Sequence, residues 1–258
     1  MRRRKTDHRN HWLDYAEEKH GEKLVAETKN VLNILILYLP LPIYWAVYMM
    51  QGSRWIFQAT RMNGDIGFYT VQPDQIIILN SFFIIATLPI CDYVFHPLLV
   101  KIKLGSFLQK MTIGIFLGVV AISISVYIEI EIQRNFISIL WIIPQYLILA
   151  ISDNFLFVSH LNFVYNEASS NMKSVMMSSV YFVMALGNLI VILVSGMKIF
   201  TLQVNELLFF AGSLLAAMVL FGFLAFRYQP VNQVKRKLVQ EEIILHEKET
   251  LLETDHKS

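Results

Sequence analysis

Six long apolar runs constrain this chain more than any other feature of its sequence. They lie near residues 31–51, 76–100, 108–130, 137–165, 172–196 and 205–227. Each run is long enough to cross a bilayer as a helix, which takes about 20 residues at about 1.5 Å per residue. Charged residues make up only 16% of the chain, against about 25% in an ordinary soluble domain. The sequence therefore predicts an all-α membrane protein with six transmembrane helices.

The distribution of basic residues predicts how these spans are oriented. The chain has 22 lysine and arginine residues, and 18 of them fall on one side of the expected membrane. These 18 lie before the first span, around the connections after the second and fourth spans, and after the sixth span. Four lie on the alternate side. Because basic residues accumulate on the cytoplasmic side of a membrane protein, we expect both termini to be cytoplasmic.

The first apolar run contains two prolines and ends in a polar sequence. Pro40 and Pro42 stand two residues apart in "LPLPIYW", and "QGSR" follows at 51–54. Each proline removes a backbone donor, so the span is expected to bend or unwind there. Lipid forbids exposed irregular backbone, and a cavity or a neighbouring helix must satisfy it. The bend is interpreted either as a moving part beside a cavity or as a static packing kink.

The second run carries two ionisable residues near its end. Such residues cost about 2.5–3.5 kcal/mol inside hydrocarbon on insertion scales, so they are candidate functional groups. Asp92 and His96 are four residues apart and therefore share one helix face. Lys101 and Lys103 follow closely. Asp92 is thus interpreted either as an end group at the membrane surface or as part of a transport mechanism.

The fourth run carries a deeper pair. Asp153 and His160 are seven residues apart on one face of the expected helix. No basic residue lies near Asp153 in the sequence, and this favours a role in a cavity. His160 is interpreted either as part of the wall of that cavity or as a residue that forms a hydrogen bond with a neighbouring helix.

Four shorter features complete the pattern. Asn63-Gly64 favours a type I′ turn in the first outer loop. Gly114 and Gly118 form a small-xxx-small spacing, which we interpret as a helix-packing surface rather than a dimer interface. In the tail, Lys235–Lys237 would be attracted to anionic lipid. Glu247–Leu252 fits an acidic dileucine sorting pattern and is interpreted either as such a signal or as part of a plain amphipathic tail.

The sequence contains no motif that indicates an enzyme. It has no H-E-x-x-H, G-x-S-x-G or P-loop sequence, and its histidines and aspartates lack metal-ligand spacing. We therefore expect neither catalysis nor a bound cofactor.

Several blocks of the sequence, taken in order, resemble one known family. They are "HWLDYA" at 11–16, "LPLPIYWAVYMMQGSRWIFQAT" at 39–60, "QPDQ" at 72–75, "DYVFHPLLVK" at 92–101, "IPQYLILAISD" at 143–153 and "SNMKSV" at 170–175. Together they resemble the proton-coupled oligopeptide transporters of the major facilitator superfamily. Members of this family have twelve spans in two six-helix bundles. The resemblance covers the second bundle only, spans seven to twelve.

The resemblance implies a domain organisation and a set of site residues. It assigns residues 1–30 to a cytoplasmic linker, 31–227 to one six-helix bundle and 228–258 to a cytoplasmic tail. It implies that Trp45 and Gln51 line a peptide cavity and that Asn80 contacts the peptide. Asp153 stands where the family has a glutamate that pairs with the amino group of the peptide. Asp92, His96, Pro40 and Pro42, singled out above from the sequence itself, are the candidates for coupling or gating.

The chain also departs from the family pattern. Met49 replaces an aspartate, and Asn33 replaces an arginine that usually pairs with the aspartate at position 92. Further departures fall at Val180, Tyr181, Phe157 and Asn162. These changes lead us to expect weakened proton coupling through this half.

The resemblance implies the following function. The chain would be the C-terminal half of a proton-coupled di- and tripeptide transporter, with protons as the coupling ion and no other cofactor. We expect it not to transport alone. Its expected partners are small peptides, the lipid bilayer and a complementary six-helix bundle, with no nucleic acid. We expect it in the plasma membrane, with an endosomal or lysosomal membrane as the alternative. The alternative function is a non-transporting membrane adaptor or subunit that pairs with a full-length relative.

Overall fold

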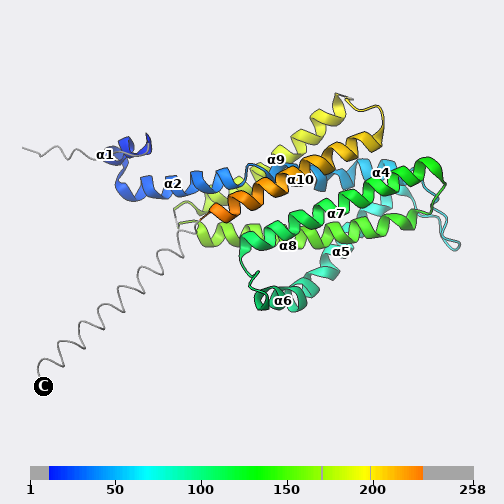
Figure 1. Ribbon diagram of the computed structural model, residues 1–258, viewed down its shortest axis with the longest axis horizontal. Coiled ribbons are helices and arrows are strands. Elements are labelled where there is room, and N and C mark those ends of the chain that lie inside the picture. The colour runs from blue at the N-terminus through cyan, green and yellow to red at the C-terminus, as the bar shows by residue number, and fades with distance from the viewer. Residues whose placement is uncertain (1–11, 170, 198, 229–258) are drawn as a thin grey trace, which may run out of the picture.

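The computed structural model describes residues 12–169, 171–197 and 199–228, and these residues form a bundle of helices (Figure 1). Four helices are long and continuous: α7 (Phe107–Arg134), α8 (Ile143–Glu167), α9 (Lys173–Gly196) and α10 (Gln203–Arg227). Two further spans are interrupted. The first comprises α2 (Glu22–Leu37), α3 (Leu41–Met49) and α4 (Arg54–Ala59), and the second α5 (Ile77–Ile90) and α6 (His96–Lys101). The described residues thus contain five helical segments able to cross a membrane, or six when the bent first one is counted. The predicted all-α fold with six spans is confirmed.

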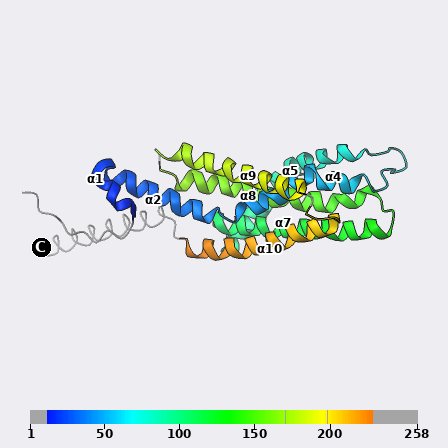
Figure 2. The ribbon, with the colours of Figure 1, turned by 90° about the horizontal axis from the view of Figure 1, so that it is seen from above.

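Short segments connect and precede these helices. They are η1 (Trp12–Ala16), α1 (Glu17–His20), η2 (Met50–Gly52), η3 (Pro73–Ile76), η4 (Cys91–Phe95) and η5 (Ile139–Ile142). The spans run side by side along the long axis of the molecule (Figure 2). We call the end where α2 begins and α10 stops the terminal end. The opposite end, which carries α4 and the connection between α7 and α8, is the loop end.

The first span breaks at its prolines, as predicted. Residues 38–40 form turns, and the helices on either side of them differ in direction by 51°. Leu41 donates its N–H to the Tyr38 carbonyl at 3.0 Å, which is a turn bond rather than an α-helical bond. Pro40 lacks the N–H that would continue the helix, and Pro42 lies in the first turn of α3, where a donor is not needed.

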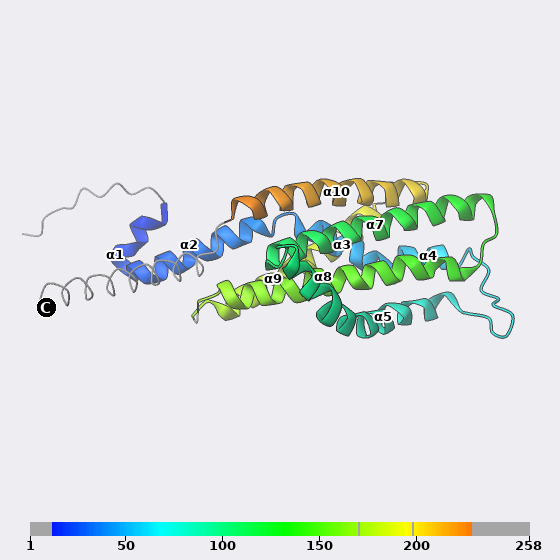
Figure 3. The same cartoon turned by 60° about the horizontal axis from the view of Figure 1, so that its bottom comes forward.

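The second span widens into one π-helical turn, which the sequence analysis did not predict. This turn, η4, joins α5 to α6. Pro89 lies shortly before it and Pro97 shortly after it. Because Pro97 has no N–H to donate to the carbonyl four residues earlier, the regular ladder is interrupted here. Figure 3 shows α5 at the edge of the bundle, where it packs against α8, and Figure 1 shows α6 at the same edge.

Glycines set the closest helix contacts in the bundle. Gly114 of α7 faces α8, because a Cβ there would lie 2.8 Å from the Leu156 backbone nitrogen. A Cβ at Gly118 would lie 3.0 Å from the Tyr44 ring of α3. The predicted packing role of this pair is therefore confirmed within the chain. At Gly187 of α9, a Cβ would lie 2.6 Å from the Trp45 Cβ. The backbones of α9 and α3 can approach this closely only because Gly187 has no side chain.

The loop between α4 and η3 contains a different turn from the one predicted. Asp65 and Thr70 form an antiparallel bridge, and the reversal lies between them, where Gly67 has φ +92°. Asn63 instead exchanges backbone hydrogen bonds with Ile137 and Ile139 at 2.8 Å each. The type I′ turn predicted at Asn63-Gly64 is thus wrong, because Asn63 is held by the loop between α7 and α8.

The six spans differ in how much surface they bury. About half or more of the apolar windows of α7 and α8 is buried, whereas α5, α9 and α10 expose most of theirs. The central helices therefore form the core, and the outer helices present apolar surface outward. The sorting pattern and the basic cluster of the tail lie outside the described residues.

Candidate functional site

An aromatic wall lies at the centre of the bundle, on α3. Trp45 is 1% exposed, and its ring meets the ring of Phe157 from α8 edge to face at a centroid distance of 5.7 Å. Tyr48 and Tyr44 lie edge to face on the same indole at 5.4 and 5.5 Å. These contacts combine large apolar area with favourable edge-to-face geometry.

Asp153 lies on α8, one turn before Phe157, and faces this wall. It is 8% exposed, and its Oδ1 atom has no hydrogen-bond partner among the described residues. Its carboxylate is within electrostatic range of the hydroxyls of Tyr44 and Tyr48. A buried carboxylate without a cation is costly and is typical of a site that receives a positively charged group.

Asn80 reaches the same place from α5. It is 6% exposed, and its Nδ2 donates to the Tyr48 hydroxyl at 3.3 Å. Its Oδ1 atom is buried without a hydrogen-bond partner in the described part of the chain. Asn80 therefore offers an acceptor close to the Tyr48 hydroxyl.

Gln51 lies just beyond α3, in η2. Its side-chain amide is close to the Tyr48 hydroxyl, and its backbone carbonyl accepts a hydrogen bond from the Tyr146 hydroxyl at 3.0 Å. The structure thus brings all four predicted substrate-binding residues around one side chain, Tyr48. The sequence analysis missed Tyr48, although its spacing of three from Trp45 places both on one helix face.

The predicted coupling residues of the second span do not join this group. Asp92 lies in η4 and His96 begins α6, and both are exposed. The Asp92 carboxylate interacts electrostatically with Lys110 of α7. Pro40 and Pro42 lie in the break of the first span and at the start of α3.

His160 differs from its expected role. It is fully buried, and neither ring nitrogen has a hydrogen-bond partner among the described residues. Its ring packs edge to face on Tyr38, at 4.5 Å, beside the break in the first span. The predicted hydrogen bond to a neighbouring helix is therefore wrong. His160 packs against the break as an aromatic group.

One serine connects the site to two other spans. The Ser152 hydroxyl donates to the Gly114 carbonyl of α7 at 2.7 Å and lies 2.9 Å from the Tyr44 hydroxyl of α3. On the other side of Asp153, the Nδ2 of Asn154 donates to Thr87 Oγ1 of α5 at 2.9 Å. Asp153 is thus flanked in sequence by residues that fix α8 against three neighbours.

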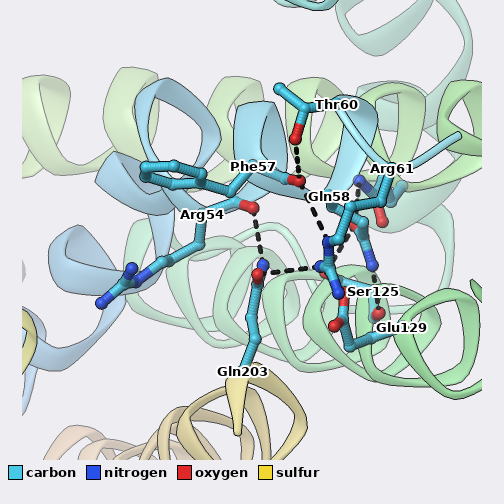
Figure 4. A network of polar contacts seen from close by, with 9 residues as sticks. Arg54, Phe57, Gln58, Thr60, Arg61, Ser125, Glu129 and Gln203 are labelled. Carbon is cyan, nitrogen blue, oxygen red and sulfur yellow. Dashed lines mark hydrogen bonds and ion pairs between the residues drawn. The ribbon is translucent and has the colours of Figure 1, made fainter. Parts of the chain in front are cut away.

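Figure 4 shows a network of polar contacts at the loop end, which the sequence analysis did not predict. Arg61 of the loop after α4 donates to buried Glu129 of α7 at 2.6 Å and to Gln203 of α10 at 2.9 Å. Arg54 forms an ion pair with Glu206 at 2.9 Å, and Gln203 donates to the Arg54 carbonyl at 2.7 Å. The partners are far apart in sequence, and no spacing rule could have paired them.

These features define a polytopic α-helical membrane protein with a polar group of side chains enclosed in its bundle. A family model described as the POT family matches residues 1–205. The chain belongs to this family.

Curated relatives agree with this assignment. Solute carrier family 15 member 1 of Oryctolagus cuniculus is 46% identical over 128 residues, which are 49% of this chain and 18% of the relative. The Homo sapiens member 1 is 41% identical over the same length. Member 2 of Rattus norvegicus is 42% identical over 126 residues, 48% of this chain and 17% of the relative. The matched segment thus spans less than a fifth of the length of each relative.

Solved structures share the fold. The chain is similar to an auto-inhibited POT family peptide transporter with a TM-score of 0.77 and 24% identity, over 85% of this chain and 45% of that one. For the POT family transporter PepTSo the TM-score is 0.78, with 24% identity over 84% and 45%. The chain accordingly shares the fold of a little less than half of each of these transporters.

Proposed function

We propose that this chain is the C-terminal half of a proton-coupled di- and tripeptide transporter and contributes part of its peptide cavity. The bundle is equivalent to spans seven to twelve of the family. The solved proteins with the same fold are described as peptide transporters. The observation that carries the proposal is the buried Asp153 carboxylate, which lies beside an aromatic wall with no cation near it among the described residues.

Each side chain around Tyr48 has a separate task in this proposal. Asp153 pairs with the ammonium group of the peptide, a charge-assisted contact that is stronger than a neutral hydrogen bond. Asn80 accepts a peptide N–H through its free Oδ1 atom, and Trp45 and Tyr48 pack against an apolar side chain of the peptide. Gln51 offers its amide at the loop end of the same wall. The ammonium group in turn compensates the carboxylate, which would otherwise remain buried and unpaired.

The coupling residues act outside this contact. Protons are the proposed coupling ion, with no other cofactor. Asp92 and His96 lie on the second span near the π-helical turn, where the helix ladder is already interrupted. Pro40 and Pro42 produce the bend that lets the two halves of the first span change their angle as the cavity opens.

A second six-helix bundle completes the protein in this proposal. The exposed apolar surfaces of α5, α9 and α10 must face lipid or another bundle. Both termini are cytoplasmic, and the plasma membrane is the proposed location, with an endosomal or lysosomal membrane as the alternative. Because half of the cavity is missing, the chain alone does not transport.

Binding of a dipeptide tests the role of Asp153. The full chain, paired with the N-terminal bundle of a relative, would be titrated with alanyl-alanine and with N-acetyl-alanyl-alanine by calorimetry. We expect acetylation or Asp153→Asn to weaken binding at least about tenfold, because a hydrogen bond to a charged group contributes about 1.5–3 kcal/mol. Asp74→Asn, which alters an exposed carboxylate in η3, should leave binding unchanged. Equal binding of the two ligands would refute the role of Asp153.

Uptake tests the transport proposal separately. Proteoliposomes with an acidic exterior should accumulate dipeptide when they contain the paired bundles and not when they contain this chain alone. Accumulation by the chain alone would overturn the half-transporter proposal. Stable pairing without uptake would instead support a non-transporting subunit.

A further inference from the structure

A groove of about 530 Å³ lies at the terminal end, away from the site around Tyr48. One side is α2, and the other is the end of α8, the connection that follows it and the start of α9. Its floor is apolar and includes Ile34 and Met176, which are fully buried. Its rim carries the carboxylates of Glu22 and Glu27, and Glu167, which is 8% exposed, also lines it.

The polar groups of the groove favour a ligand that donates hydrogen bonds and is positively charged. The Nδ2 of Asn30 donates to the Glu167 carbonyl at 3.3 Å. Asn30 Oδ1 and Ser169 Oγ are buried without hydrogen-bond partners among the described residues. Among the described residues that line the groove, Lys23 is the single basic one, and the carboxylates of this set outnumber it.

The chain leaves the bundle beside this groove. Tyr228 follows α10 directly, and its ring packs edge to face on Phe163 of α8 at 5.6 Å. Its hydroxyl is close to the carboxylate of Glu167, one of the residues that line the groove. Figure 1 shows the ends of α8 and α10 at the same end of the molecule as α2.

The sequence that follows Tyr228 is complementary to the groove. It reads "QPVNQVKRKLV" from residue 229, with three consecutive basic residues and then Leu238 and Val239. Six residues separate Tyr228 from Lys235, and an extended chain of that length spans about 20 Å. The basic residues can therefore reach the rim while Leu238 reaches the apolar floor.

We propose that residues 235–239 of the tail bind in this groove, with their basic side chains on Glu22, Glu27 and Glu167 and with Leu238 on the floor. Exposed ion pairs contribute only about 0–1 kcal/mol each. The tether makes the contact effective, because a short linker gives a local concentration in the millimolar range. The bound tail would join α2 to the start of α9 and so restrain the broken first span. This proposal does not depend on peptide transport.

Disulfide formation in the full chain tests the contact. In a Cys91→Ala background, which removes the one native cysteine, one variant carries Ala26→Cys and Leu238→Cys. Ala26 lines the groove. The matched control carries Leu24→Cys and Leu238→Cys, because Leu24 is on α2, is 38% exposed and lies outside the groove lining. We expect cross-linking through Ala26→Cys to be at least about tenfold faster than in the control, and to slow in 1 M salt, which screens charges beyond about 3 Å.

Charge reversal and lipid composition supply the remaining outcomes. Lys235→Glu, Arg236→Glu and Lys237→Glu together should abolish the preference for Ala26→Cys in nanodiscs of neutral lipid. An unchanged preference, or equal rates for the two α2 positions, would overturn the proposal. Loss of cross-linking in nanodiscs with anionic lipid would also overturn it, since the tail would then bind lipid instead. Faster capture by a cysteine placed at Lys5 than by one at Leu238 would assign the groove to the N-terminal segment and overturn it too.

Discussion

Tyr48 occupies the position that connects the residues of the candidate site. Its hydroxyl accepts a hydrogen bond from Asn80 and lies close to the amide of Gln51. It also interacts electrostatically with the Asp153 carboxylate. Its ring packs edge to face on the Trp45 ring. A residue with this many neighbours positions the others and would also touch a bound ligand.

Tyr48→Phe separates these two roles of the side chain. We expect it to keep the ring contact with Trp45 and the thermal stability of the protein, but to weaken dipeptide binding about fivefold, the equivalent of one hydrogen bond of about 1 kcal/mol. Tyr181→Phe on α9, where the ring is 56% exposed, should change neither quantity. Titration calorimetry and thermal unfolding of both variants would check this. Unaltered affinity of Tyr48→Phe would exclude the hydroxyl from the site.

The residues of the site were predictable only as far as sequence neighbours and family resemblance reach. Trp45 and Asp153 could be named because they stand in recognisable blocks. Phe157, noted only as a departure from the family pattern, forms the second face of the wall with Trp45. Its contact could not be inferred, because it depends on how α8 is rotated against α3.

At the scale of the helices, the contact between α3 and α9 depends on one glycine. A Cβ at Gly187 would lie 2.8 Å from both the Ala46 nitrogen and the Pro42 carbonyl oxygen. These are backbone atoms, so they cannot move aside without shifting the whole of α3. The backbone of α9 therefore packs directly against the site-bearing helix α3, at Trp45 itself.

Gly187→Ala tests this contact. We expect it to destabilise the protein by about 1–3 kcal/mol through overpacking, although alanine is the better helix former by about 1 kcal/mol. Gly212→Ala makes the same change in α10, where nothing lies within 4 Å of the new atom, and should be neutral or stabilising. Denaturant unfolding in detergent would measure the free energy of unfolding of the two variants. Equal stability of the two variants would show that α9 can move away from α3 at this position without cost.

The helices themselves were largely predictable, and the exceptions have physical causes. Apolar runs placed the spans, and the prolines placed the break at residues 38–40. The π-helical turn at Cys91–Phe95 was missed because hydropathy does not record how a helix is wound. The turn at Asn63-Gly64 failed because a tertiary contact with residues 137–139 overrides a local preference.

At the scale of the whole molecule, charged side chains join the spans at the loop end. Arg61 and Glu129 are 68 residues apart and Arg54 and Glu206 are 152 apart. These pairs connect the first span to the third and to the sixth. Sequence reasoning treats each charge singly, so it found neither pair.

Two glutamates of α7 provide a matched test of this network. Glu129 is fully buried on Arg61, whereas Glu131 is 21% exposed and lies 3.9 Å from Arg134. Glu129→Gln should destabilise the bundle by about 2 kcal/mol, below the 3–5 kcal/mol typical of a fully buried pair, because Arg61 is 39% exposed. Glu131→Gln should cost less than about 0.5 kcal/mol. Thermal unfolding of both would show the difference, and similar costs would mean that the network adds nothing to stability.

The hydroxyl of Ser152 has a mechanical consequence for its neighbour Asp153. It is bonded to α7 and lies against the Tyr44 hydroxyl of α3, so α8 cannot slide at this level without straining both attachments. Any force on the carboxylate is consequently shared by three helices. The candidate site is therefore as rigid as this three-helix unit. A bound ligand would move either all three helices together or none of them.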